Sequence, residues 1–79
     1  MRNNYEGKEK LVSEYLEPLL VEVMETQTPV QRVEYMKHPD GHESVEITFV
    51  NPDIESLHVN VSGDSCLALV LDVMEAIAL

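Results

Sequence analysis

Residues 38–42, HPDGH, lie between two runs in which apolar and polar residues alternate, and they restrict the possible folds more than any other segment. Proline presets φ, aspartate bonds to its own backbone, and glycine tolerates positive φ, which suits a three-residue hairpin loop with a bulge. Pairing His38 with His42 sets the register of both strands. The opposite residues are then Lys37 and Glu43, Tyr35 and Val45, Glu34 and Glu46, and Val33 and Ile47. Because the apolar partners share one face, we expect an antiparallel hairpin with one buried side.

A third strand is predicted after a turn at residues 51–53, because Leu57, Val59 and Val61 alternate with polar residues. Residues 62–65, SGDS, then supply the N-cap chemistry of a helix that continues to the end of the sequence. These elements and a helix before the hairpin give the order α-β-β-β-α. We expect an α+β fold in which a three-stranded antiparallel meander carries two helices packed on one face.

Residues 8–25 have the spacing of an amphipathic helix. Its apolar arc contains Val12, Tyr15, Leu16, Leu19, Leu20 and Val23, and its acidic arc contains Glu14, Glu17, Glu22 and Glu25. Pro18 projects into the acidic arc, where the carbonyl that it leaves unpaired faces water, so we expect a kink rather than a break. We expect residues 1–6 to form a flexible arm and residues 7–79 to form a single domain.

The charge of the chain excludes several classes of partner. Asp and Glu total 15 against 5 Lys and Arg, a formal net charge of −10, which repels phosphate backbones and anionic lipid. No apolar run reaches the roughly 18 to 20 residues that cross a bilayer, and the first residues have no signal-peptide core. We therefore expect a cytoplasmic protein without direct nucleic-acid or membrane binding. Cys66 is the only cysteine, so the chain forms no internal disulfide.

The order α-β-β-β-α over about 70 residues resembles the topology of the double-stranded RNA-binding domain. That family grips phosphates with lysines at the start of its second helix. The corresponding residues 63–68 of this chain, GDSCLA, are acidic and apolar. The resemblance supports the fold, and no RNA-contacting residue is carried over from it.

The second helix is unusually apolar. Between Cys66 and Leu79 only Asp72 and Glu75 are charged, and the apolar residues span roughly 160° of arc, more than one small sheet can cover. One interpretation is a deeply buried core helix in a monomer. The other is an interface with a second copy or another protein, and its candidate residues are Leu69, Val73, Ala76 and Leu79.

The outer face of the predicted sheet collects polar side chains, namely Arg32, Glu34, Glu46, His58 and Asn60. Glu34 opposite Glu46 can be a catalytic carboxylate pair, although an open sheet offers no cleft that excludes water. The alternatives are a solvated face with Arg32 as the counter-charge, or a protein-binding surface. We do not expect catalysis here.

Two further candidates carry weaker signals. His38, Asp40 and His42 can form a metal site at the hairpin, or be polar residues of an exposed turn. Cys66, at a helix start, is a candidate nucleophile with His58, but alternation places His58 on the outer face, so we interpret Cys66 as a small buried hydrophobe. We expect no cofactor and no metal.

These observations favour a small acidic interaction or regulatory module without enzymatic activity, paired with itself or with another protein. Two alternatives stay open. The acidic arc of the first helix can imitate phosphates and inhibit a nucleic-acid-binding protein. The hairpin histidines and the outer-face carboxylates can instead serve a small metal-dependent factor or enzyme.

Overall fold

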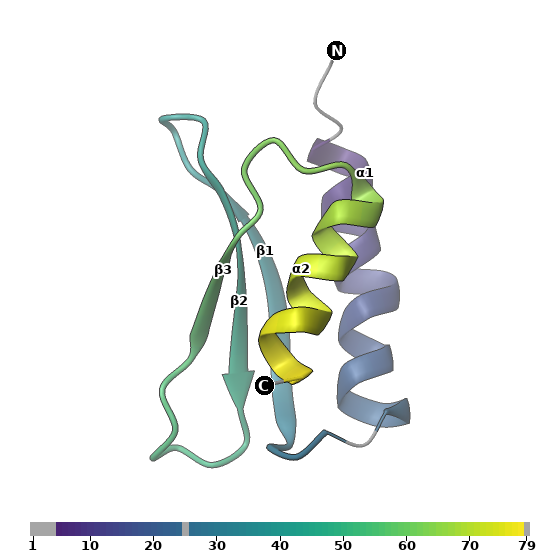
Figure 1. Cartoon of the computed structure of the whole chain (residues 1–79), viewed down its shortest axis with the longest axis vertical. Coiled ribbons are helices and arrows are strands. Elements are labelled where there is room, and N and C mark those ends of the chain that lie inside the picture. The colour runs from purple at the N-terminus through teal and green to yellow at the C-terminus, as the bar shows by residue number, and fades with distance from the viewer. Residues whose placement is uncertain (1–4, 25, 79) are drawn as a thin grey trace.

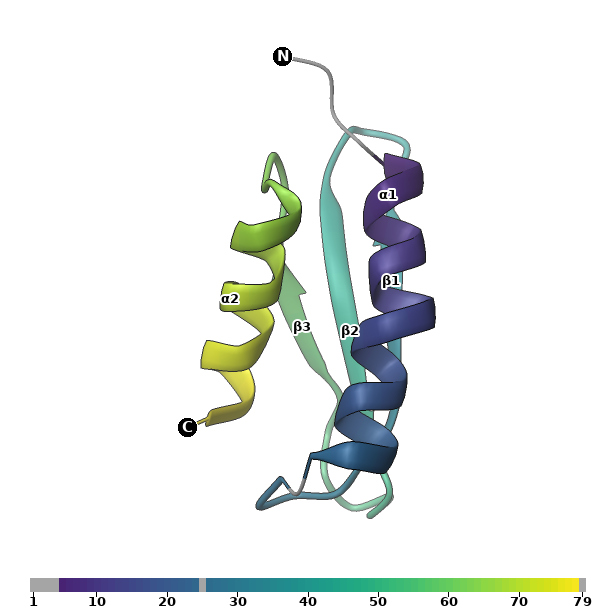
Figure 2. The same cartoon turned by 90° about the vertical axis from the view of Figure 1, so that its right-hand side faces the viewer.

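A three-stranded antiparallel sheet forms one layer of the molecule, and two helices cover one of its faces (Figures 1 and 2). The computed structural model describes residues 5–24 and 26–78 and confirms the α+β fold. The strands are β1 (Val30–Lys37), β2 (Glu43–Phe49) and β3 (Leu57–Asn60), in the order β1-β2-β3. The last helix is α2 (Cys66–Ala78). No helix within the described ranges has the length and apolar character that crossing a membrane requires.

The predicted hairpin register is confirmed. Val33 pairs with Ile47, Glu34 with Glu46, Tyr35 with Val45 and Lys37 with Glu43. The His38 N–H donates to the His42 carbonyl at 2.8 Å and closes the loop, in which Gly41 has a φ of 95°. A register shift between Val30 and Arg32 adds a bulge near the start of β1.

The first helix runs without interruption from residue 5 to residue 23 (Figure 2). It comprises α1 (Tyr5–Lys10), η1 (Leu11–Leu16) and η2 (Leu19–Val23), the last two being π-helical. Tyr5 and Glu6, which the sequence placed in a flexible arm, belong to α1 instead. The helix passes through Pro18 in ordinary helical geometry, with φ −60° and ψ −36°, so the proline does not break it.

The buried line of this helix has a spacing of four residues. Lys8, Val12, Leu16 and Leu20 are all at most 3% exposed. In an α-helix this spacing would drift by about 40° per step. Wider turns reduce that drift, and the Glu17 N–H accordingly bonds to the carbonyl of Val12, five residues back. The prediction that Tyr15 and Val23 face the core is wrong, because they are 61% and 71% exposed.

The core lies between the helices and the inner face of the sheet. Strand β2 alternates strictly, with Glu43, Val45, Ile47 and Phe49 buried. Helix α2 begins where expected, since the Ser65 Oγ accepts a hydrogen bond from the Ala68 N–H at 3.1 Å. Leu69 and Val73 of α2 complete the core.

Candidate functional site

The charged groups on the inner side of the sheet are held in an internal network centred on Glu43. Its Oε1 accepts from the Lys8 ammonium at 2.5 Å and from the Tyr35 hydroxyl at 2.6 Å, and its Oε2 accepts from the Gly63 N–H at 3.0 Å. Lys8 and Glu43 are each 1% exposed. Burial and the bond to Glu43 both raise the pKa of Tyr35 above its usual range, so its hydroxyl remains a donor. The network ties the first helix to the hairpin and to the loop before α2.

Asp64, in the loop before α2, and Asp72 of α2 lie within electrostatic range of this network. The Asp64 Oδ2 atom is buried, and among the described residues it has no hydrogen-bond partner. Burial and then the interaction with the Asp72 carboxyl raise the pKa of Asp64 to about 6. Lys8 acts in the opposite direction on the same carboxyl, and Glu43 adds to the increase. Lys8 and Glu43 are almost completely buried, so these two side chains are not accessible to a substrate.

Sequence reasoning missed this network, although its signals are present. Side chains alternate between the two faces of a strand, so Glu43 lies on the same inner face as Val45, Ile47 and Phe49. Lys8 lies four residues before Val12 on the buried line of the first helix. A buried carboxylate and a buried ammonium on facing elements predict an ion pair, because an unpaired buried charge is too costly.

The outer-face residues are brought together as the register predicted. Glu34 lies opposite Glu46, and Glu46 lies opposite His58 on β3. The Arg32 guanidinium is 2.6 Å from the Glu34 carboxylate, and the His58 Nε2 is 3.5 Å from Glu46. The Glu34 carboxylate raises the pKa of Arg32, which stays charged. Each carboxylate therefore has its own basic neighbour.

Asn60, the fifth of the predicted outer-face residues, bonds to the backbone. Its Oδ1 accepts from the Ser62 N–H at 3.0 Å at the end of β3. Cys66 is half-buried at the start of α2, and His58 is engaged with Glu46 on the outer face. The structure does not pair the thiol with the imidazole.

The hairpin histidines take different partners. The His38 Nε2 lies 3.0 Å from the Ser44 Oγ, and the His42 Nδ1 lies 2.7 Å from the Asp40 carboxylate. Hydrogen bonds from the His42 backbone and then its side chain lower the pKa of Asp40. In residues 5–24 and 26–78, no three side chains of His, Cys, Asp or Glu converge on a possible metal position.

The acidic arc of the first helix is divided. Glu14 and Glu22 are exposed, whereas Glu17 turns toward the sheet, where its Oε2 accepts from the Val33 N–H at 3.0 Å. The prediction that Glu17 shares the solvent face of Glu14 is therefore wrong. Glu25, the fourth member, lies outside the described residues.

Two of the predicted interface residues of α2 belong to the core. Leu69 and Val73 are 0% exposed, Ala76 is half-buried, and Leu79 lies outside the described residues. Leu67 and Leu71 are instead 69% and 59% exposed. The rotation of α2 buries Leu69 and Val73 in the core and turns these two leucines outward.

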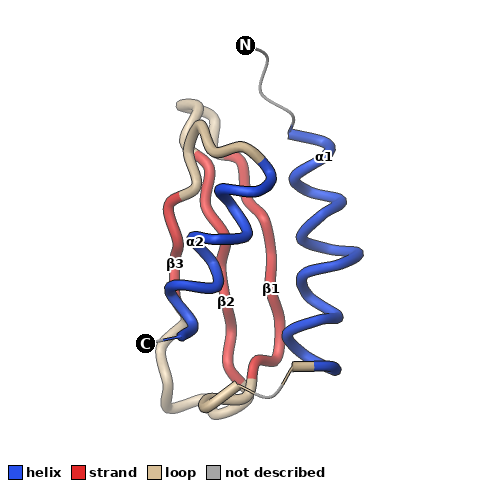
Figure 3. The backbone as a smooth tube through the Cα atoms, turned by 45° about the vertical axis from the view of Figure 1, so that its right-hand side comes forward, coloured by secondary structure: helices blue, strands red, loops and turns tan. Residues whose placement is uncertain are grey.

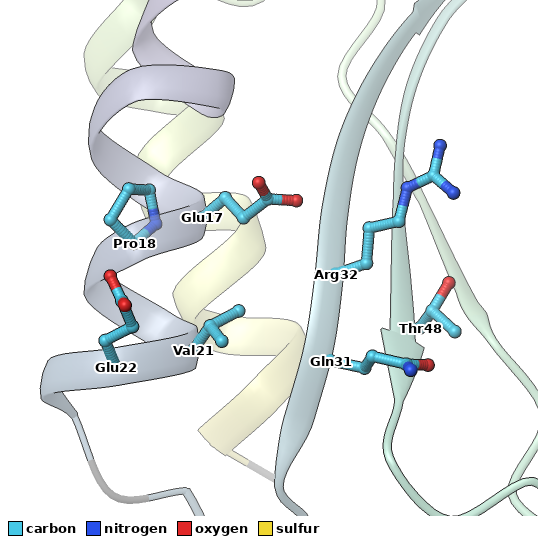
Figure 4. Close-up of a pocket in the computed structure, with 7 residues that line it drawn as sticks. All are labelled: Glu17, Pro18, Val21, Glu22, Gln31, Arg32 and Thr48. Atoms are coloured by element: carbon cyan, nitrogen blue, oxygen red, sulfur yellow. The ribbon is translucent and has the colours of Figure 1, made fainter.

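Strand β1 lies at the side of the sheet nearest the first helix (Figure 3). Two hollows form a groove along its open edge. One hollow of about 630 Å³ is lined by Glu17, Pro18, Val21, Glu22, Gln31, Arg32 and Thr48. Glu17 reaches across it toward β1, while Arg32 and Thr48 lie on the other side of the strand (Figure 4). A second hollow of about 350 Å³ continues along the same edge and is lined by Glu9, Ser13, Glu17, Arg32, Val33, Glu34 and Tyr35.

Comparisons of this chain with protein-family models, with curated proteins and with solved structures found no match.

Proposed function

We propose that this chain is a small acidic protein-interaction module that acts without catalysis and pairs with a second copy of itself through the exposed face of α2. The observation that carries this proposal is the pair Leu67 and Leu71. They lie one helical turn apart, and both are more than half exposed. Neighbouring leucines that remain uncovered are typical of association surfaces.

Charge favours a second copy as the occupant of this face. The net charge of −10 makes two copies repel each other over most of their surface. Helix α2 has no acidic residue in its first turn, where Leu67 lies, and only Asp72 and Glu75 farther along. Two α2 helices related by a two-fold axis can therefore bring their leucines together with little charge repulsion.

The arrangement of the polar groups supports a role without catalysis. Lys8, Tyr35 and Glu43 are bound to one another, and the outer-face carboxylates each have a basic neighbour on an open sheet. Active sites are ordinarily concave pockets with converging polar groups. The phosphate-mimicking alternative has less support, because Glu17 of the acidic arc accepts a hydrogen bond from β1 and does not lie on the solvent face with Glu14.

The test of the proposed dimer is the mass in solution by light scattering over a concentration series. We expect a dimer of the 8.9 kDa chain and a monomer for the Leu67→Glu/Leu71→Glu variant. The matched control is Val50→Glu, which changes another exposed apolar residue outside α2 and should leave the mass unchanged. Circular dichroism verifies that each variant is folded. A monomeric wild-type chain at all concentrations would refute self-association.

A further inference from the structure

Strand β1 presents backbone hydrogen-bonding groups at the open edge of the sheet. It is eight residues long and, among the residues that the structure describes, has a strand neighbour on one side only. In an antiparallel pair, alternate residues direct their N–H and C=O groups away from the partner strand. Val33 is one of these residues, because its N–H donates to Glu17 and not to β2. Tyr35 lies two residues farther along β1, so its backbone N–H and C=O groups also point to the open edge.

Glu17 stands where an added strand would bind. Its carboxylate oxygen occupies, 3.0 Å from the Val33 nitrogen, the position that a backbone carbonyl takes in a sheet. A side chain in this position protects the edge, and its rotation away frees the Val33 N–H for the carbonyl of an added strand. Val33 and Tyr35 line the second hollow, which lies beside this edge.

The groove is strongly acidic. Four carboxylates line its two hollows, those of Glu9, Glu17, Glu22 and Glu34, against the single guanidinium of Arg32. Arg32 is already paired with Glu34 at 2.6 Å. A second copy would bring another set of carboxylates to the same edge, so charge disfavours it as the occupant. A segment that carries lysine or arginine is complementary.

We propose that the open edge of β1 binds an extended segment of a basic protein, which adds as a fourth strand. Backbone bonds to Val33 and Tyr35 hold the segment, as in other cases of strand addition. The lysine or arginine side chains of the bound segment that point toward the first helix lie among Glu9, Glu17 and Glu22. Glu17 releases the Val33 N–H and then pairs with one of these cations. This site is separate from the α2 face and does not depend on dimer formation.

The probe for this proposal is a short capped peptide of alternating lysine and threonine, titrated into the full chain by calorimetry. A version N-methylated at every residue keeps the charges but cannot donate backbone hydrogen bonds. We expect the first peptide to bind and the N-methylated one to bind at least about tenfold more weakly. Equal affinity of the two peptides would overturn strand addition. Absence of binding by the unmethylated peptide up to millimolar concentration would overturn the proposal as a whole.

The matched variants locate the site. Glu9→Gln/Glu22→Gln removes two charges from the groove, and Glu14→Gln/Glu55→Gln removes two exposed charges elsewhere. We expect the first variant to weaken binding about tenfold and the second to change it about twofold or less. Bound peptide should also slow hydrogen exchange of the Val33 and Tyr35 amides. An equal loss of affinity in both variants, or unchanged exchange of these amides, would overturn the site.

Discussion

The Lys8 ammonium lies 2.5 Å from the Glu43 Oε1 atom, although 35 residues separate the two in sequence and both are almost completely buried. Two further donors, the Tyr35 hydroxyl and the Gly63 N–H, satisfy the same carboxylate. The pair therefore connects the first helix, the hairpin and the loop that leads into α2. This connection adds to the apolar packing that holds the two helices on the sheet.

Removing one partner of this pair should destabilise the protein strongly. We expect Lys8→Met to lower the free energy of unfolding by about 3–5 kcal/mol, because the Glu43 charge stays buried without its counter-ion. Lys8→Met combined with Glu43→Gln should recover part of this loss, since no charge stays buried, although the single amide oxygen replaces only one of the two acceptor atoms that Tyr35 and Gly63 use. Urea denaturation measures these differences, with Lys10→Met as the control on an exposed lysine. A loss in the control as large as that of Lys8→Met would contradict the role of the buried pair.

The stability of the protein should depend on pH through Asp64. Its pKa of about 6 in the folded protein lies above the value of about 3.9 in an unfolded chain, because of burial and the Asp72 carboxyl. The folded state thus binds more protons between these pH values, and the stability from this group is lost as pH rises through about 6. We expect Asp64→Asn to stabilise the protein at pH 7.5 by about 1–2 kcal/mol relative to wild type, and much less at pH 4. Urea midpoints across this range are the measurement, with the exposed Asp53→Asn as control.

The rotation of α2 can be tested with two leucines. Leu69→Ala should cost about 2–5 kcal/mol of unfolding free energy because Leu69 is fully buried, independently of protein concentration. Leu67→Ala at high dilution should cost about 0.5 kcal/mol or less, because this side chain is 69% exposed. The opposite order of the two effects would show that α2 packs through its other face.

Glu17 should protect the edge of β1. We expect Glu17→Ala to accelerate hydrogen exchange at the Val33 amide about tenfold and to cost about 1 kcal/mol, since the amide loses its acceptor. Glu14→Ala on the same helix removes an equal charge without a contact to the strand and is the control. Unchanged exchange at Val33 would argue against the bond.

The hairpin should not respond to zinc. His38 and His42 have different hydrogen-bond partners, Ser44 and Asp40, and the structure does not direct their ring nitrogens to a common point. We expect the melting temperature to be the same with zinc, with manganese and with a chelator. An increase with zinc that disappears in His38→Ala and in His42→Ala would instead support the metal-site hypothesis.

Local patterns predicted the hairpin well. Proline, aspartate and glycine within residues 38–42 define one loop, and strict alternation in β2 leaves one register that buries its apolar side. The same alternation predicts that Glu34, Glu46 and His58 are neighbours on the outer face of the sheet. The order of the elements and the start of α2 at its Ser65 cap were also predictable, because they depend on residues close together in sequence.

The helix faces were not predictable in the same way. A periodicity of 3.6 residues placed Tyr15 and Val23 in the core, but π-helical turns shift the buried line to every fourth residue. In α2 an apolar arc wider than the sheet leaves the rotation about the helix axis open, and the packing of Leu69 and Val73 into the core selects it. Glu17 bonds to Val33 rather than facing water, since only the packed sheet brings that N–H within reach.

The sequence alone therefore determined the elements, their order, the strand register and the acidic surface, because these depend on neighbouring residues and on parity. Tertiary structure alone decided which side of each helix is buried, which charges pair inside, and which edge and which leucines stay open. These depend on contacts between residues far apart in the chain, such as Lys8 with Glu43, whose free energies no local pattern contains.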